Sequence, residues 1–406
     1  MKKVLIFSLS YYPYVGGAEI AIREITDRIN PEEIEFHLLT IRNDRALPRE
    51  EKIGNVHVHR IGLAIHAPTT EDFKKFPLRI NKYLFELLAP LTAHALHAKY
   101  AFDAAWAMMA HSSGIPGGLF KQWHPSVRYL LTLQEGDPIE GIERSMRFVW
   151  PLFTQGFTRA DALQAISNFL LDWGVRMGFS GEARVIPNGV AVREFTHQHT
   201  DAEVTQMKRT LGKKDADVFL VTTSRLVHKN GIDVVIRALA SLPKHISFLV
   251  YGTGADEAML KALAVSCGVE DRVRFMGQID HKDMPLMLSC CDIFIRPSRS
   301  EGMGNSFIEA MAAGLPVVAT LEGGIVDFLY DARTRPDTEA TGWAVPKDSP
   351  EEIVTVVKEI MERPDVAAKV TSNAKVMVSK KYDWDAISTD MKNLFMEMIA
   401  TPSQKG

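Results

Sequence analysis

Cysteine is scarce in this chain, because only Cys267, Cys290 and Cys291 occur among its 406 residues. An odd, sparse set with two adjacent members makes a poor disulfide framework, which indicates a reducing compartment. No run of 18 apolar residues occurs either, so we expect no segment to span a membrane. The apolar start, residues 1–10, lacks a small-residue cleavage site and is better interpreted as a buried strand. These absences predict a cytoplasmic protein.

A basic excess is also missing, since the formal net charge is −3 at pH 7. Nucleic-acid-binding domains usually carry a clustered basic surplus, so nucleic acid is not an expected partner. Metal motifs are lacking too. His57 and His59 share a strand face, and His94 and His97 are helix neighbours, but neither pair is accompanied by nearby cysteine or acidic ligands. We therefore expect neither a metal ion nor another cofactor.

The length of the chain favours two domains, because 406 residues exceed the roughly 250–300 at which one hydrophobic core stops growing. Strand and helix patterns alternate in the first half, and a second such series begins near Val218. Alternation of this kind predicts parallel sheets with helices on both faces. The expected fold is α/β, with two Rossmann-like doubly wound domains facing an inter-domain cleft. Residues 1–192, joined by a C-terminal helix at 385–406, would form the first domain and residues 193–384 the second.

The most specific pattern is an apolar strand, residues 292–297, followed by a glycine-rich turn and a helix. Gly302 and Gly304 mark the turn, so the free backbone N–H groups of the helix fall near Asn305 and Ser306. A helix start of this kind binds phosphate groups.

Two carboxylates accompany that turn. Glu301 lies in it, and Glu309 follows roughly two helical turns later. Carboxylates repel phosphate, so they more plausibly bind the neutral hydroxyl groups beside it. A ligand with both phosphate and hydroxyl-rich ends is a nucleotide-sugar.

A cationic loop follows the strand that begins at Val218 and supplies Arg225 and Lys229. Positive groups aimed at a diphosphate leaving group stabilise its developing charge. In doubly wound sheets ligands bind at the carboxyl ends of the strands, and glycine pairs follow strands at Gly16-Gly17 and at Gly252-Thr-Gly254. Neither pair forms a GxGxxG or a Walker A sequence, so NAD and ATP have no motif support.

Together these pieces resemble the retaining glycosyltransferases of family 4, which have the GT-B fold and are also called glycosyl transferases group 1. The resemblance runs from about residue 2 to residue 395. It is carried by the Glu301 to Glu309 element and by four further motifs: Gly16-Gly-Ala-Glu19, Ala165-Ile-Ser-Asn168, Val185-Ile-Pro-Asn-Gly-Val190 and Ser224-Arg-Leu-Val-x-Lys-x-Gly231.

The resemblance implies an enzyme, a hexosyltransferase that uses a nucleoside-diphosphate sugar such as a UDP- or GDP-sugar, without a metal ion and with retention of configuration. Arg225 and Lys229 would hold the diphosphate, and Glu301 would contact hydroxyls of the sugar. The other implied donor contacts are the ribose-binding Glu309 and the backbone of Gly16, Gly17, Gly252, Gly304, Asn305 and Ser306.

One position departs from the family pattern. Many members carry a histidine after the fourth or fifth strand of the first domain, near the sugar, where this chain has Gln134. Glutamine can donate a hydrogen bond but cannot carry a positive charge. Either sugar selection is altered, or Glu135, Asp137 or His111 takes part of the histidine's role. All four residues are candidate sugar or acceptor contacts.

The acceptor is expected to be a glycan, a lipid-linked sugar or a small molecule, in cell-envelope or polysaccharide biosynthesis. Residues 73–85 and 144–150 mix basic with aromatic and aliphatic side chains, a pattern that occurs on peripheral membrane surfaces and more often on ordinary amphipathic helices. Contact with the inner face of a membrane is therefore one expectation. Two other functions stay open, a non-catalytic nucleotide-sugar-binding subunit and a GT-B epimerase, which would need acid–base residues such as Glu135 and Asp137.

Overall fold

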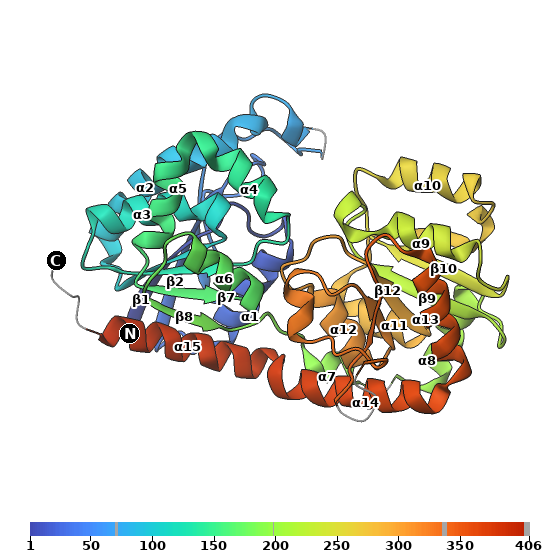
Figure 1. Ribbon diagram of the computed structural model, residues 1–406. Helices are drawn as coiled ribbons and strands as arrows, with labels where there is room; N and C mark the ends of the chain where they lie inside the picture. Colours follow the sequence, from blue (N-terminus) through green and yellow to red (C-terminus); the bar gives the residue numbers. More distant parts are fainter. Residues whose placement is uncertain (70–71, 198, 335–338, 402–406) are drawn as a thin grey trace. The chain divides into compact units, whose positions relative to one another are not determined.

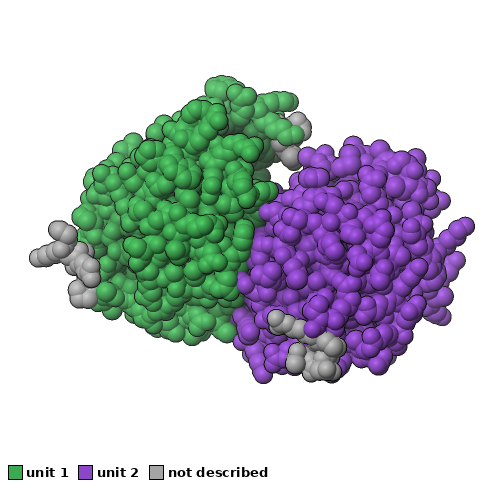
Figure 2. Space-filling view, in the orientation of Figure 1, with its two compact units in different colours: residues 1–188, 384–406 green, residues 189–383 purple. Residues whose placement is uncertain are grey.

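The computed structural model describes residues 1–69, 72–197, 199–334 and 339–401. The chain divides into two compact units (Figure 2). Unit 1 combines Met1–Asn188 with the chain from Trp384 onward, and unit 2 spans Gly189–Asp383. The sequence places the corresponding boundaries at 192/193 and 384/385.

Unit 1 is built on an eight-stranded sheet with the strand order β3-β4-β2-β1-β5-β6-β7-β8. Neighbouring strands run parallel except for β3, which pairs antiparallel with β4. The strands are β1 (Lys2–Phe7), β2 (Ile34–Ile41), β3 (Glu50–Ile53), β4 (Val56–Ile61), β5 (Ala104–Met108), β6 (Arg128–Leu133), β7 (Ala162–Ala165) and β8 (Glu182–Val185).

Helices cover both faces of this sheet (Figure 1). They are α1 (Gly17–Arg28), α2 (Asn81–Tyr100), α3 (Ile115–Trp123), α4 (Ile139–Met146), α5 (Trp150–Thr158), α6 (Asn168–Arg176) and the C-terminal α15 (Trp384–Ala400). Because side chains alternate along a strand, Val4 and Ile6 of β1 join the apolar core with α1 and α15, whereas the ring of Phe7 lies 5.8 Å from that of Phe120 on α3. The C-terminal helix α15 and the N-terminal strand β1 thus belong to the same hydrophobic core.

Unit 2 has a six-stranded, wholly parallel sheet with the order β11-β10-β9-β12-β13-β14. Its strands are β9 (Val218–Thr223), β10 (Ile246–Tyr251), β11 (Val273–Gly277), β12 (Ile293–Arg296), β13 (Val317–Ala319) and β14 (Trp343–Ala344). Its helices are α7 (Val192–Phe195), α8 (Asp201–Thr210), α9 (Ile232–Leu239), α10 (Glu257–Ser266), α11 (Met284–Ser289), α12 (Asn305–Ala313), α13 (Pro350–Glu362) and α14 (Pro364–Lys381). Parallel pairing brings the carboxyl ends of the central strands to one edge.

The long helix α2 begins at Asn81 and is preceded by a separate 3₁₀ turn, Leu78–Ile80. One element differs from the sequence-based expectation. The strand Glu50–Ile53 was not expected, since its four residues are mostly charged. It lies at the edge of the sheet, where charged side chains reach solvent. Across the described ranges, no helix is both long and apolar enough to cross a bilayer.

Candidate functional site

In unit 2 the strand, the glycine turn and the helix lie where the sequence predicts them. Strand β12 ends at Arg296, and α12 begins at Asn305. Gly304 caps this helix with a φ of +88°, a left-handed conformation that favours glycine. A Cβ atom there would also lie only 2.6 Å from a terminal nitrogen of Arg296 and from the ring of Phe307. Both the backbone and the packing therefore require glycine at the helix start.

The last residue of β12, Arg296, is the centre of a buried polar network that the sequence analysis missed. Its Nη2 lies 2.7 Å from Glu301 Oε2, and its Nη1 donates to Ser306 Oγ at 2.8 Å. The guanidinium carbon lies 4.1 Å from the centroid of the Phe307 ring. Burial lowers the pKa of Arg296, and the carboxylates of Glu301 and Glu309 act in the opposite direction. The sequence feature that could have indicated this network is an arginine at the end of an apolar strand.

This network holds the first predicted carboxylate in place. The side chain of Glu301 is 11% exposed, and its second oxygen, Oε1, accepts from the N–H of Gly302 at 3.1 Å. A carboxylate has about four acceptor positions, so Glu301 can still accept a hydrogen bond from a ligand hydroxyl. Its orientation is fixed before any ligand binds.

The second predicted carboxylate has a partner of its own. Glu309 Oε1 lies 3.2 Å from Nε2 of His281, which belongs to the short turn before α11. The Glu309 side chain is 13% exposed, and that of His281 is 46% exposed. His281 was not singled out from the sequence, because it lies in a polar loop, residues 280–283, that is 28 positions from Glu309 along the chain.

The cationic loop packs directly against the turn that carries Glu301. Arg225 and Lys229 follow β9, and Arg225 is exposed while Lys229 is half-buried. The carbonyl of Lys229 accepts from the N–H of Arg299 at 2.6 Å. Gly231 has a φ of +67°, and a Cβ on it would clash with the carbonyl of Pro297. The two predicted elements, 76 positions apart at Arg225 and Glu301, are thus neighbours in space.

An ion pair reinforces this contact. The guanidinium of Arg299 donates to both carboxylate oxygens of Asp233, each at 2.8 Å, and it also bonds Asp348. Burial raises the pKa of Asp233, but the hydrogen bond and charge of Arg299 outweigh it, so the pKa is lowered overall. The bond joins the start of α9 to the turn after β12.

Two further glycines bring neighbouring loops to the same edge. Gly252, after β10, has a φ of +131°, and a Cβ there would clash with the carbonyl of Ser224. At Gly323, after β13, a Cβ would clash with the carbonyl of Glu301. The loops after four parallel strands therefore meet around the predicted donor residues of unit 2.

Unit 1 holds the other predicted residues at its own strand ends. Gly16 caps α1, and its N–H donates to Glu19 Oε2 at 2.7 Å, with Gly17 as the first helical residue. Burial raises the pKa of Glu19. Asp137 is exposed on the loop after β6.

His111, Gln134 and Glu135 lie together at the ends of β5 and β6. Oε1 of Glu135 lies 3.4 Å from His111 Nδ1 and accepts from the His111 N–H at 3.3 Å. The amide of Gln134 exchanges two hydrogen bonds with the amide of Asn188, at 3.0 and 3.3 Å. Asn188 belongs to a motif that carries the family resemblance, but its pairing with Gln134 could not be foreseen from the sequence.

The histidine pair of β4 has an acidic neighbour, which corrects the interpretation that His57 and His59 lack one. His59 Nδ1 lies 3.6 Å from Glu50, and on the adjacent β2 His37 Nε2 lies 2.8 Å from Glu35. Burial lowers the pKa of His37 to about 4. Even so, the described residues contain no group of three or more His, Cys, Asp or Glu side chains placed to hold a metal ion.

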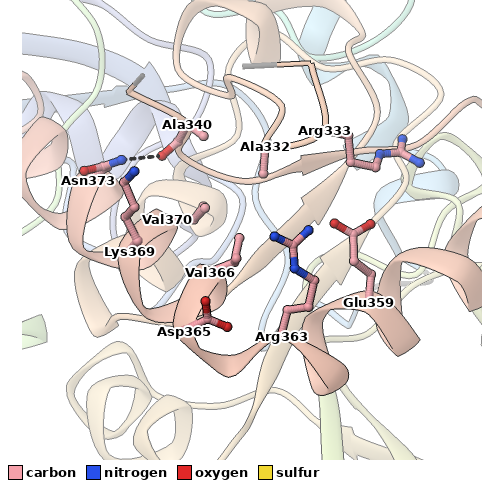
Figure 3. A pocket seen from close by; sticks show the side chains of 10 residues that line it. All are labelled: Ala332, Arg333, Ala340, Glu359, Arg363, Asp365, Val366, Lys369, Val370 and Asn373. Carbon is pink, nitrogen blue, oxygen red and sulfur yellow. Dashed lines mark hydrogen bonds between the residues drawn. The ribbon is translucent and has the colours of Figure 1, made fainter. Parts of the chain in front are cut away.

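One cavity of about 650 Å³ lies in unit 2 against α13 and α14 (Figure 3). The guanidinium of Arg363 and the carboxylate of Glu359 point toward the same space, and Asn373 donates to the carbonyl of Ala340 at 3.2 Å. None of the residues that line it is a predicted site residue. The cavity therefore lies outside the predicted donor site.

Comparisons with known proteins agree with the motifs. The family description "Glycosyl transferases group 1" matches residues 203–377, and "Glycosyl transferase 4-like domain" matches residues 16–189. A "GDP-mannose-dependent monoacylated alpha-(1-6)-phosphatidylinositol monomannoside mannosyltransferase" of Corynebacterium glutamicum is 24% identical, with 97% of each chain covered. "Alpha-monoglucosyldiacylglycerol synthase" of Acholeplasma laidlawii is 21% identical, covering 98% of this chain and 99% of the relative.

The fold has close counterparts among solved structures. The crystal structure of Anabaena Alr3699/HepE in complex with UDP matches with a TM-score of 0.76 at 18% identity, covering 98% of this chain and 100% of that one. At this level of identity the likeness concerns the fold, which is GT-B.

Proposed function

Because this chain belongs to the family 4 type of glycosyltransferases with the GT-B fold, we propose that it transfers a sugar from a nucleoside-diphosphate sugar to a hydroxyl group. The transfer would retain the configuration at the anomeric carbon and need no metal ion. The single observation that carries this proposal is the packing of the Arg225–Gly231 loop against the turn of Glu301. It brings cationic side chains and an oriented carboxylate to one sheet edge.

In the proposed reaction the bond between the anomeric carbon and the diphosphate oxygen breaks, and a bond to the acceptor oxygen forms on the same face of the sugar. The leaving phosphate takes the proton of the acceptor hydroxyl. Arg225 and Lys229 would stabilise the charge that develops on the diphosphate. Glu301 would accept hydrogen bonds from sugar hydroxyls, Glu309 would bind the ribose, and the N–H groups at the start of α12 would bind phosphate.

We propose a lipid-linked or glycan acceptor in cell-envelope or polysaccharide biosynthesis. The names of two relatives support a lipid acceptor, since one acts on a phosphatidylinositol mannoside and the other makes a glucosyldiacylglycerol. The UDP in the Anabaena structure and the GDP-mannose in a relative's name make UDP- and GDP-sugars the first donors to test.

A surface of unit 1 supports contact with a membrane. Tyr83, Leu87 and Leu91 follow one another at four-residue spacing on α2, and they are 61%, 68% and 58% exposed. We call this stripe the α2 surface. Residues spaced by four share one helix face, so these side chains present a continuous apolar strip. The chain before it is basic and exposed, with Lys74, Lys75 and Arg79.

A second segment has the same character. Phe148 is 83% exposed, and the exposed Arg144 and Arg147 precede it. Basic groups beside exposed apolar side chains fit an anionic lipid surface, where charge attraction and burial of apolar area act together. A location on the inner face of a membrane would bring a lipid-linked acceptor to unit 1.

The proposed function is tested by a screen of UDP-, GDP- and ADP-sugars with EDTA present. Thermal shift would report binding, slow sugar release would report the donor, and NMR of the product would give its anomeric configuration. Loss of turnover in EDTA would contradict the metal-free reaction. A product with inverted anomeric configuration would contradict the retaining reaction. Binding without release, even with acceptor extracts, would favour a non-catalytic binding subunit. A changed sugar in the nucleotide would favour an epimerase.

A further inference from the structure

The chain leaves β5 through an unusual turn. Met109 has a φ of +69°, a left-handed conformation that is strained for a long side chain. A five-residue π-helix follows, Ala110–Gly114. Turns of this kind are rare and often occur at functional sites. In the described part of the chain the hydroxyl of Ser113 is fully buried without a hydrogen-bond partner. The strained residue Met109 and the unpaired hydroxyl of Ser113 therefore flank His111, the one ionisable residue of the turn.

A buried carboxylate lies against this turn. The Glu135 side chain is 0% exposed, and a buried carboxylate is tolerated only with hydrogen-bond donors around it. Its oxygens accept from the N–H of Gln134 at 2.9 Å and from the N–H of His111 at 3.3 Å, with His111 Nδ1 at 3.4 Å. Glu135 thus ties the loop after β6 to the imidazole after β5.

Gln134 is already engaged. Its side-chain amide is held by both hydrogen bonds to Asn188, whose side chain is itself buried. Turning this amide toward a ligand would break both bonds. The His111 side chain, by contrast, is 26% exposed and can meet a ligand without breaking its contact with Glu135.

We propose that His111 contacts a sugar hydroxyl of the substrate and that Glu135 is its positioning residue. The inference rests on the proposed function, and it places the sugar contact on the histidine after β5 and not on the engaged amide of Gln134. A carboxylate only accepts hydrogen bonds, so the proton on Nδ1 faces Glu135 and Nε2 is the atom offered to the substrate. Glu86 of α2 is a second carboxylate that interacts electrostatically with His111.

The test uses His111→Ala, His111→Gln and Glu135→Gln in the full-length protein, with His94→Ala as the matched control. His94 lies on α2, with its Nδ1 3.0 Å from Nε2 of His124. Donor hydrolysis without acceptor, transfer to acceptor, and melting temperature are measured for each variant. We expect His111→Ala to lower kcat by about 10²-fold, with the melting temperature and the control unchanged.

The activity that is lost in His111→Ala shows whether this residue contacts the donor sugar or the acceptor. If hydrolysis and transfer fall together, His111 contacts the donor sugar, and if transfer alone falls, it contacts the acceptor. His111→Gln should recover part of the rate, because glutamine can still donate a hydrogen bond to a sugar oxygen. Glu135→Gln should lower kcat by less than His111→Ala and should cause no further loss in the His111→Ala background, because Glu135 acts only through the imidazole.

Wild-type rates in His111→Ala would overturn the inference, as would a rate loss fully explained by unfolding. Calorimetric binding of the donor and of a sugar acceptor gives a second readout that needs no turnover. If the wild-type protein is inactive and His111→Ala weakens its binding of the sugar, the inference is supported and the proposed function is contradicted. If the wild-type protein is inactive and His111→Ala leaves sugar binding unchanged, the inference is overturned.

Discussion

Arg296 and Glu301 form a salt bridge of 2.7 Å across the turn that joins β12 to α12. Their side chains are 6% and 11% exposed, so the pair is almost entirely removed from water. The same guanidinium bonds Ser306 and stacks on Phe307. One buried cation therefore sets the position of the carboxylate and of the helix start, the two features proposed to bind the donor.

Replacing Arg296 by methionine should destabilise unit 2 and lower activity. Removing one partner leaves Glu301 as an uncompensated buried charge, which typically costs about 3–5 kcal/mol. Arg296→Lys keeps the charge but cannot reach both Glu301 and Ser306 with a planar fork, so it should be intermediate. Urea unfolding measures the effect, and an unchanged midpoint in Arg296→Met would contradict the role of the pair.

Glu301→Gln and Lys229→Ala should each reduce turnover by orders of magnitude while the protein stays folded. Glu301→Gln keeps a hydrogen-bond acceptor for Arg296 but leaves this buried cation without its counter-charge, so the melting temperature should fall as it does in Arg296→Met. Rates are therefore measured well below the unfolding transition. Initial rates at saturating donor measure the effect. Glu362→Gln is the control, because it makes the same substitution at an exposed residue. Rates equal to those of the wild type in either variant would remove the assigned roles.

Gln134→His should change the donor preference. The substitution breaks the reciprocal amide pair with Asn188 and places an ionisable ring where the family usually has one. The ratio of kcat/KM for two donor sugars measures the change, with Asn188→Ala as the companion that removes both hydrogen bonds of the pair without adding a ring. An identical donor profile in Gln134→His would place this side chain away from the sugar.

The Asp233–Arg299 pair should make unit 2 sensitive to acid. The folded-state pKa of Asp233 is lowered, so its contribution to stability is present above the unfolded value near 3.9 and is lost as the pH falls through the lower folded value. Asp233→Asn should therefore lower the melting temperature at pH 7 more than at pH 3. Equal shifts at both pH values would show that the charge of Asp233 contributes nothing.

The full-length protein should float with liposomes that contain anionic lipid and not with neutral ones. Leu87→Ser with Leu91→Ser should weaken the association by removing apolar area from the α2 surface. Val376→Ser is the matched control, because Val376 is an apolar residue of α14 that is 51% exposed in unit 2. Absence of the wild-type protein from the lipid fraction would end the membrane proposal.

Local patterns predicted the elements of the candidate site in unit 2. A strand, two glycines and a helical period predict the order of strand, turn and helix, because each depends on residues close in sequence. The cationic loop follows its own strand in the same way. Short edge strands such as Glu50–Ile53 escaped prediction because their composition is polar and their pairing depends on a neighbouring strand.

The sequence by itself determined the fold class, the two-domain organisation and the residues that carry the family resemblance, since periodicity and glycine placement are local properties. Tertiary structure decided the partners. Gln134 meets Asn188 across 54 positions and His111 meets Glu135 across 24, because the parallel strands β5, β6 and β8 end at one edge of the sheet. Which carboxylate is buried beside which cation depends on that packing, and no spacing along the chain encodes it.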